Sequence, residues 1–237
     1  GKHIYPAFID LWSGYGIQSP EKLAPKTNQF ERPVPAAMAW NMAIHPETQV
    51  ISHYKIKDAE AGVLRKAGFA AVVSHQQDGI ARGSGALVGL LKNDESKSVI
   101  KPGVGMFYSF ERGVSNQAYP SSQMGSIALL RQAFYDADWY KANPNKRTYN
   151  LSFEALNAQN KLPMFFEAQN WLEVLRADCI ADEFKYNLIV KSGGDDYQRL
   201  DALKAAGIKL ILPMNYPAAW DLSDAYSEAV IPLSAML

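Results

Sequence analysis

The chain has 237 residues, of which 48% are hydrophobic, and its 24 basic side chains balance 24 acidic ones. This length suffices for one large globular domain or two small ones, and zero net charge provides no field that would attract nucleic acid or an anionic membrane surface. The sequence therefore argues against a nucleic-acid partner, and no apolar run reaches the roughly 20 residues of a membrane-spanning helix.

The chain has a single cysteine, Cys179, which excludes an internal disulfide and a thiolate metal cluster. Its position on the apolar face of a predicted helix indicates core packing. The cysteine count leaves the compartment open, and a secreted or periplasmic parent protein is compatible with it. Because residue 1 stands almost directly before a predicted strand, we expect a fragment of a longer protein.

Short apolar runs alternate with helical patterns, which favours β/α units and a mainly parallel sheet. In the first half of the chain the pattern predicts strands at 3–9, 69–73 and 104–109, and helices at 58–67 and 124–140. Residues 15–50 contain five prolines, and we expect them to wrap the surface as an excursion.

The second half repeats the pattern more clearly, with strands predicted at 163–166, 187–190 and 208–212. Asn170 and Glu173 form a capping-box start for the first intervening helix, and Gly207 ends the second. The segment after Pro213 is predicted to be helical. Six strands in one domain spanning 1–237 fit either an incomplete β/α barrel, which needs eight strands to close, or an open doubly wound sheet.

In both architectures the working residues follow the strands at their carboxyl ends. His75, with Asp78 nearby, is a candidate base oriented by a carboxylate or else a histidine that binds loop carbonyls. Glu167 is a candidate general acid or the ion-pair partner of Lys191 on the neighbouring strand. Asp10 follows the first predicted strand and completes the set of candidates.

Two glycine-rich turns precede predicted helices, at 83–85 before 86–91 and at 192–194. Backbone N–H groups at such a helix start can hold an anion. Neither turn has the lysine or the third glycine of a phosphate-binding fingerprint. The plain alternative for each is a tight turn without a ligand.

Several stretches resemble the amidohydrolase superfamily, and in particular its imidazolonepropionase-like branch. They are "GKHIYPAFID", "DAEAGVLRKAGFAAVVSH", "GSGALVGLL", "PSSQMGSIALLRQAF" and the region from "LPMFFEAQNW" to "LILPMNYP". The resemblance implies an α/β fold of the TIM-type (β/α) barrel kind, incomplete here at about six of eight strands. It also implies metal-dependent hydrolysis of amide-type C–N bonds with zinc or another divalent metal.

The chain departs from the family at the metal ligands. Trp12 and Gly14 stand where the resemblance places a His-x-His pair, and Glu167 and Ser192 stand where later strands supply histidines. Tryptophan and glycine side chains offer no lone pair to a metal, and a serine hydroxyl is a weak ligand. We therefore expect no metal cofactor and interpret these four positions as a degenerate metal site.

Three functional hypotheses remain open. The first is an inactive domain with a structural or ligand-binding role beside an active barrel of the same parent chain. The second is a working hydrolase that uses His75, Asp10 and Glu167. The third is glycan or peptide binding by an aromatic pocket, whose rings would otherwise only fill the former site: Trp12, Tyr15, Phe107, Tyr108 and Phe110.

Overall fold

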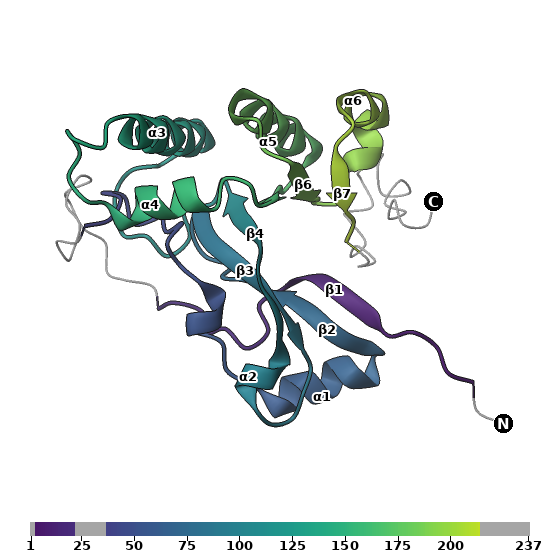
Figure 1. The fold of residues 1–237 in the computed structure, drawn as a ribbon. Coiled ribbons are helices and arrows are strands. Elements are labelled where there is room, and N and C mark those ends of the chain that lie inside the picture. Colours follow the sequence, from purple (N-terminus) through teal and green to yellow (C-terminus); the bar gives the residue numbers. More distant parts are fainter. Residues whose placement is uncertain (1–2, 22–36, 214–237) are drawn as a thin grey trace. The chain divides into compact units, whose positions relative to one another are not determined.

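The computed structural model describes residues 3–21 and 37–213 and divides the chain into two compact units at Pro163 and Met164. The first unit holds β1 (Phe8–Ser13), the 3-10 helix η1 (Val50–Ser52), α1 (Asp58–Lys66), β2 (Phe69–Ser74), β3 (Ala81–Gly89), α2 (Glu95–Ser98), β4 (Val99–Ser109), α3 (Gln123–Ala142) and α4 (Leu151–Ala158) (Figure 1). The second unit holds β5 (Met164–Glu167), α5 (Trp171–Phe184), β6 (Leu188–Lys191), the 3-10 helix η2 (Asp196–Arg199), α6 (Leu200–Ala206) and β7 (Lys209–Ile211). The segment after Pro213, predicted to be helical, lies outside the described residues.

The strands of the first unit do not form the mainly parallel sheet that we predicted. β1 pairs in parallel with β2, but β3 runs antiparallel to both β2 and β4. The reason is local. Only the connection from β1 to β2 contains a helix long enough for a crossover, α1, whereas β2, β3 and β4 follow one another through short turns that reverse the chain.

The predicted strand at 3–9 starts too early. β1 begins at Phe8, whose N–H donates to the carbonyl of Gly68 at 3.0 Å, and it runs on to Ser13. Pro6 lies just before it and has no N–H to give to a ladder. As a result Asp10 and Trp12 lie within the strand and not after it.

The helix predicted at 86–91 is wrong, because these residues lie in and just after β3. β3 is buried along nearly its whole length, and Gly85 lies directly against the Phe107 ring of β4, so closely that a Cβ there would overlap the ring. A short apolar run does not by its period distinguish a buried strand from a helix. The 83–85 turn therefore precedes no helix, which removes the basis for an anion site there.

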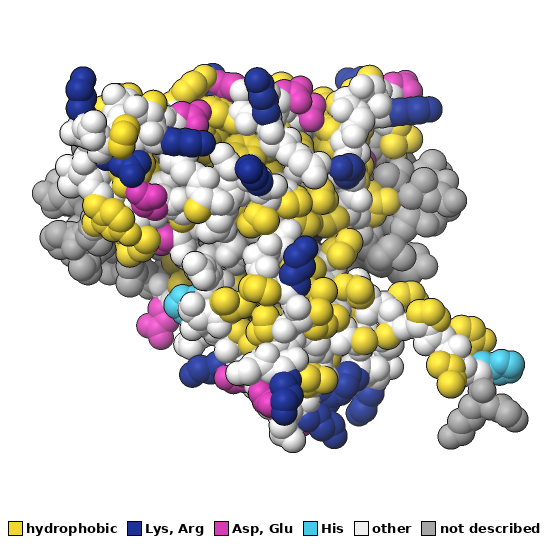
Figure 2. Space-filling view, viewed as in Figure 1, with side chains coloured by type: hydrophobic (Ala, Val, Ile, Leu, Met, Phe, Trp, Pro, Cys, Tyr) yellow, Lys and Arg dark blue, Asp and Glu magenta, His cyan; other side chains and the backbone are white. Residues whose placement is uncertain are grey.

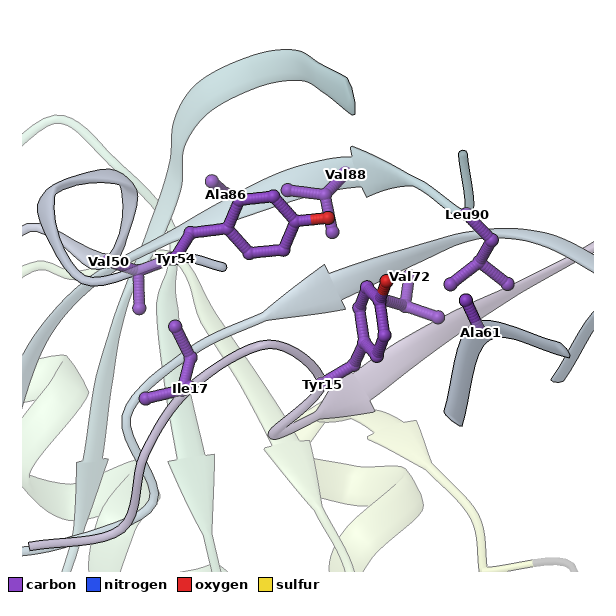
Figure 3. Packing of buried hydrophobic residues seen from close by; sticks show 9 residues of the cluster. All are labelled: Tyr15, Ile17, Val50, Tyr54, Ala61, Val72, Ala86, Val88 and Leu90. Carbon is purple, nitrogen blue, oxygen red and sulfur yellow. The ribbon is translucent and has the colours of Figure 1, made fainter. Parts of the chain in front are cut away.

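A hydrophobic core cluster lies where β2 and β3 meet the loops on either side of η1 (Figure 3). Its residues are Tyr15, Ile17, Val50, Tyr54, Ala61, Val72, Ala86, Val88 and Leu90. Tyr15, Ile17 and Val50 belong to the 15–50 segment, and Ala43 and Ile44 of the same segment are also buried. The expected surface excursion does not hold at 15–17 and over much of 39–50, where apolar side chains pack into the core, whereas 18–21 are exposed as expected; residues 22–36 lie outside the described range.

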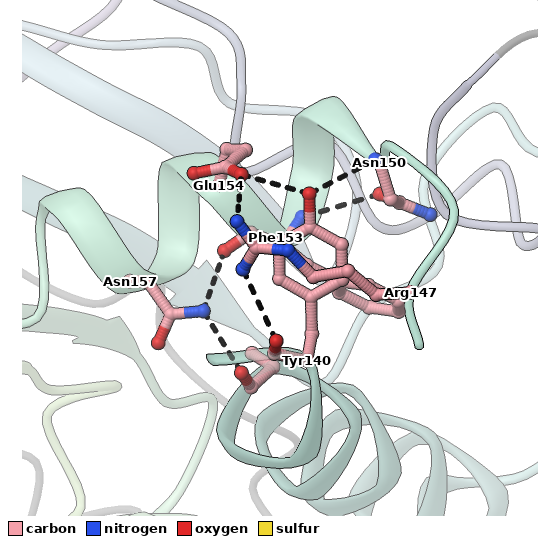
Figure 4. Close-up of polar contacts among 7 residues, drawn as sticks. Tyr140, Arg147, Asn150, Phe153, Glu154 and Asn157 are labelled. Carbon is pink, nitrogen blue, oxygen red and sulfur yellow. Dashed lines mark hydrogen bonds and ion pairs between the residues drawn. The ribbon is translucent and has the colours of Figure 1, made fainter. Parts of the chain in front are cut away.

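Helices α3 and α4 are joined by a polar network (Figure 4). The Tyr140 hydroxyl donates to Glu154 Oε1 at 2.7 Å, and Arg147 reaches the same oxygen at 3.1 Å. The Arg147 guanidinium lies 3.9 Å from the centre of the Tyr140 ring. The predicted helix at 124–140 is confirmed as α3, whereas α4, capped by Asn150, was not predicted.

The second unit follows the predicted pattern closely. β5, β6 and β7 pair in parallel, with α5 and α6 between them. Asn170 caps α5 by accepting from the Glu173 N–H at 3.0 Å, and Gly207 ends α6 in the left-handed conformation. The prediction that Cys179 packs in the core is wrong, because its side chain is exposed on α5.

The surface of the first unit exposes apolar side chains along residues 3–7 and β1. Ile4 and Tyr5 are 95% and 79% exposed, and Phe8, Ile9 and Leu11 of β1 remain about half exposed or more. Figure 2 shows the N-terminal stretch before β1 projecting beyond the unit, with hydrophobic side chains along it. Among the described residues, none of the helices has the length and apolar character to cross a membrane.

Candidate functional site

Three rings gather at the carboxyl ends of β1 and β2. The Trp12 ring centre lies 4.3 Å from that of His75 in an edge contact and 5.3 Å from that of Phe107. His75 stacks on Phe107 with 3.9 Å between ring centres. The position at which the resemblance places the first metal-binding histidine is therefore occupied by an indole packed in an aromatic cluster.

The position of His75 is fixed by a backbone hydrogen bond and by this ring packing. Its N–H donates to the carbonyl of Ser13 at 3.0 Å, and the residue is 1% exposed. The Asp78 carboxylate accepts from the Val114 N–H at 2.8 Å and so binds the turn at 113–114. A catalytic role for His75 with Asp78 stays a prediction.

Asp10 lies at the middle of β1 and is half-buried. Its Oδ1 accepts from the N–H of Trp12 at 2.9 Å, where the β1–β2 register is irregular. This hydrogen bond satisfies the Trp12 N–H at a point where the strand pairing is irregular. Asp10 therefore has a local structural role in β1.

The first-strand positions do not fit a metal. The Trp12 indole has no lone pair to donate to a metal, and Gly14 has no side chain that could supply one. A Cβ at Gly14 would lie 3.2 Å from the Gln77 side chain, so even a histidine there would require Gln77 to move. Among residues 3–21 and 37–213, no group of three or more His, Cys, Asp or Glu side chains is placed to hold a metal ion.

In the second unit Glu167 ends β5 beside Lys191 at the end of β6. The Lys191 Nζ lies 3.0 Å from Glu167 Oε1, and the Glu167 side chain is 17% exposed. The ion-pair alternative for Glu167 is confirmed. Its charge is therefore compensated on the neighbouring strand.

Ser192 follows β6 and is fully buried. Its hydroxyl donates to the carboxylate of the buried Asp196 and accepts from the Gly194 N–H at 2.9 Å. A buried carboxylate at this turn opposes a bound anion. The plain-turn interpretation of 192–194 therefore has the better support.

The aromatic pocket is not open in the way that the third hypothesis requires. Tyr15, Phe107, Tyr108 and Phe110 are each no more than 4% exposed, and only Trp12 retains partial exposure. Stacking on a sugar or peptide needs an accessible ring face. These rings fill the interior instead.

A cleft of about 950 Å³ lies in the first unit, beyond the carboxyl ends of β1 and β2. Its walls come from the loops 16–21, 42–57 and 76–78, from Arg82 of β3 and from residues 114 and 115. Sequence reasoning missed it because it assigned residues 15–50, which include the first part of the 42–57 loop, to a surface excursion. Isolated β-bridges pair Ile44 and Gln49 with residues of β3 and place this loop beside the sheet. No sequence motif predicts these bridges.

A buried carboxylate supports one wall of this cleft. Glu47 accepts from Ser152 Oγ at 2.7 Å and lies 3.2 Å from Nδ1 of the cleft residue His45. Burial by itself raises the pKa of Glu47, but the hydrogen bonds from His45 and Ser152 outweigh it, and the net pKa lies below its ordinary value of 4.5. Glu47 is therefore ionised at neutral pH and links the 42–57 loop to α4.

This network predicts a pH-dependent stability. Because the pKa of Glu47 is lower in the folded than in the unfolded chain, its contribution is complete above about pH 4.5 and disappears as the pH falls through the folded-state value. We expect Glu47→Gln to destabilise the protein at pH 7 and to differ less from wild type near pH 3. Urea unfolding at both pH values measures this, with the exposed Glu60→Gln as control; a difference independent of pH would contradict it.

No protein-family model matches the sequence, and no curated protein matches it either. Among solved structures the chain is similar to an amidohydrolase from Thermotoga maritima MSB8, with a TM-score of 0.67, 20% sequence identity and 92% of this chain covered. The chain spans 59% of the length of that protein. The likeness shows an amidohydrolase-like fold: an α/β chain corresponding to an incomplete TIM-type barrel.

Proposed function

We propose that this chain is an amidohydrolase-like domain, of the imidazolonepropionase-like kind, that no longer performs metal-dependent hydrolysis. In this proposal it has a structural or ligand-binding role beside an active barrel in a longer parent protein. The observation that carries it is the packing of Trp12 against His75 and Phe107 at 4.3 and 5.3 Å. An indole in this place does not coordinate a metal.

The physical argument concerns the source of the nucleophile. Amide hydrolysis at neutral pH in this kind of site depends on a metal that lowers the pKa of a bound water to about 7. The side chains at positions 12 and 14 supply no donor for such a metal, and Glu167 is held by Lys191 at 3.0 Å. In this proposal the chain does not bind the metal, and the hydroxide nucleophile on which the family's mechanism depends is not formed.

Metal analysis tests the proposal. Protein purified without chelator is expected to contain far less than one equivalent of zinc, nickel or iron, because two of the four expected ligand positions carry no donor atom. Stoichiometric metal that is lost in His75→Ala or Glu167→Gln, but kept in the exposed control Glu60→Gln, would overturn it. That outcome would support the rival hydrolase with His75, Asp10 and Glu167.

The structural role has its own consequence for the longer protein. If this domain braces a neighbouring active barrel, a variant that unfolds it lowers the activity or the solubility of the parent. The readout is the activity of the full-length parent with and without such a variant. Unchanged activity and solubility would favour the ligand-binding role instead.

A further inference from the structure

His45 lines the cleft beyond β1 and β2 and is linked to α4 by a series of hydrogen bonds. Ser152 Oγ accepts from the Ala39 N–H at 2.9 Å and donates to Glu47 Oε2 at 2.7 Å. The other carboxylate oxygen, Glu47 Oε1, lies 3.2 Å from Nδ1 of His45. The Glu47 side chain is 9% exposed and that of His45 is 34% exposed. A carboxylate fixed from within the protein therefore holds an imidazole that borders the cleft.

This carboxylate determines which ring nitrogen of His45 carries the proton. Glu47 is ionised at neutral pH, because its pKa lies below 4.5, and an ionised carboxylate only accepts hydrogen bonds. Nδ1 of His45 is therefore the donor, and in the neutral imidazole the lone pair lies on Nε2. Among residues 3–21 and 37–213 this nitrogen has no hydrogen-bond partner. Its lone pair is available to a molecule in the cleft.

The backbone of His45 is fixed as well. Its N–H donates to the carbonyl of Ala81 in β3 at 2.8 Å, and its carbonyl accepts from the Thr48 N–H at 3.1 Å. An imidazole held both at its backbone and at Nδ1 is oriented before a ligand arrives. A reactive side chain oriented by a second group is the usual arrangement in nucleophilic catalysis.

A second histidine of the cleft, His53, provides a comparison within the same site. His53 is exposed, and in the part of the chain that the structure describes no carboxylate pairs with its ring. His3, outside the cleft, is exposed too. Exposure alone would therefore make both of them more accessible to a reagent than His45. A preference of a reagent for His45 would have to come from Glu47 and from the cleft.

The charges of the cleft are compensated, which favours a substrate without net charge. Lys57 Nζ lies 3.3 Å from Glu60 Oε1, and Glu47 faces His45. The other charged lining residues are two cations and two anions: Lys55, Arg82, Glu21 and Asp78. Neutral hydrogen-bonding side chains make up much of the rest: Gln18, Thr48, Ser52, Gln76 and Ser115. The volume of about 950 Å³ lies within the range of small-molecule sites.

We propose that this cleft is an acyl-transfer site for a small neutral ester, with His45 Nε2 as the nucleophile and Glu47 as its positioning residue. The Nε2 lone pair forms a bond to the ester carbonyl carbon, the ester C–O bond breaks, and the leaving group departs as an alkoxide or phenolate with that electron pair. Water then attacks the acyl-imidazolium, which releases the carboxylic acid and restores the neutral ring. Glu47 stabilises the positive charge that the ring carries in between. This inference goes beyond the proposed function, and metal analysis decides that function without reference to His45.

Labelling of the wild-type chain tests the inference without any substitution. Diethyl pyrocarbonate is a small neutral acylating reagent whose product on histidine persists long enough for peptide mass spectrometry. At pH 7 we expect His45 to be labelled faster than the more exposed His53 and His3, an order opposite to that of exposure. Labelling of His53 or His3 as fast as that of His45 would overturn the inference.

Hydrolysis of 4-nitrophenyl acetate measures the roles of the two side chains. His45→Gln and Glu47→Gln are each expected to lower the rate of 4-nitrophenolate release about tenfold, the second because an amide can donate to Nδ1 and move the ring proton to Nε2. His53→Gln is the matched control and is expected to react as wild type. Circular dichroism checks the fold of each variant.

The ring-nitrogen ¹⁵N spectrum adds a readout that a merely structural role of Glu47 would not move. In wild type the proton of the neutral His45 ring is expected on Nδ1, and in Glu47→Gln on Nε2. A proton on Nε2 in wild type, or equal rates for His45→Gln and His53→Gln, would overturn the inference.

Discussion

Phe107→Ala is expected to lower the free energy of unfolding of the first unit by about 3–5 kcal/mol, the usual cost of removing a buried aromatic ring. Phe107 is 0% exposed and contacts both His75 and Trp12. Its removal would leave a cavity beneath these two rings and beside Gly85. Urea unfolding followed by circular dichroism and tryptophan fluorescence measures the effect.

The matched control for this change is Trp139→Ala, which removes a larger aromatic side chain that is 55% exposed on α3. A substitution at such a surface position is expected to change stability by no more than about 0.5 kcal/mol. A loss below about 1.5 kcal/mol for Phe107→Ala would mean that the ring cluster does not support the strand ends. The packing argument for the proposed absence of a metal site would then be weakened as well.

The sequence could predict those elements whose signals are local. Asn170 with Glu173 marks the start of α5, and Gly207 marks the end of α6, since caps and left-handed ends depend on residues within one turn. The parallel pairing of β5, β6 and β7 could be predicted because a helix connects each strand to the next. The ion pair of Glu167 with Lys191 was among the alternatives because adjacent parallel strands end at the same edge.

The sequence could not predict contacts that depend on the course of the chain between distant segments. β3 was missed because its apolar run at 86–91 has no period that distinguishes strand from helix. The stacking of His75 on Phe107 needs β3 and β4 to return as an antiparallel pair beside β2. The nearness of Trp12 and His75 could be predicted, since β1 and β2 pair in parallel and both residues lie near the carboxyl ends of these strands.

The residues of the candidate site also divide into those that the sequence indicated and those that only the structure shows. Trp12, Gly14, Glu167 and Ser192 were named as degenerate ligand positions from the family resemblance, and this assignment stays a prediction. Arg82 of the cleft was not found, because an arginine in an apolar strand has no spacing signature. Only its burial at 3% and the loops that surround it identify it.

Gly83→Ala is expected to cost about 3–5 kcal/mol of stability, more than a left-handed glycine alone would explain. Gly83 has φ +83°, a conformation that costs roughly 1–2 kcal/mol for a residue with a Cβ. A Cβ there would also overlap the Thr48 carbonyl, whose oxygen accepts the Ser84 N–H at 2.9 Å. The backbone of the 42–57 loop would have to move, which adds the cost of overpacking.

Gly103→Ala separates the two contributions. Gly103 also has positive φ, at +62°, but its nearest neighbour for a Cβ is the end of the Leu162 side chain at 3.9 Å. This variant is therefore expected to lose only the backbone term of about 1–2 kcal/mol in the same urea experiment. Equal losses for the two variants would contradict this expectation and would show that the 42–57 loop moves easily to accept a Cβ at position 83.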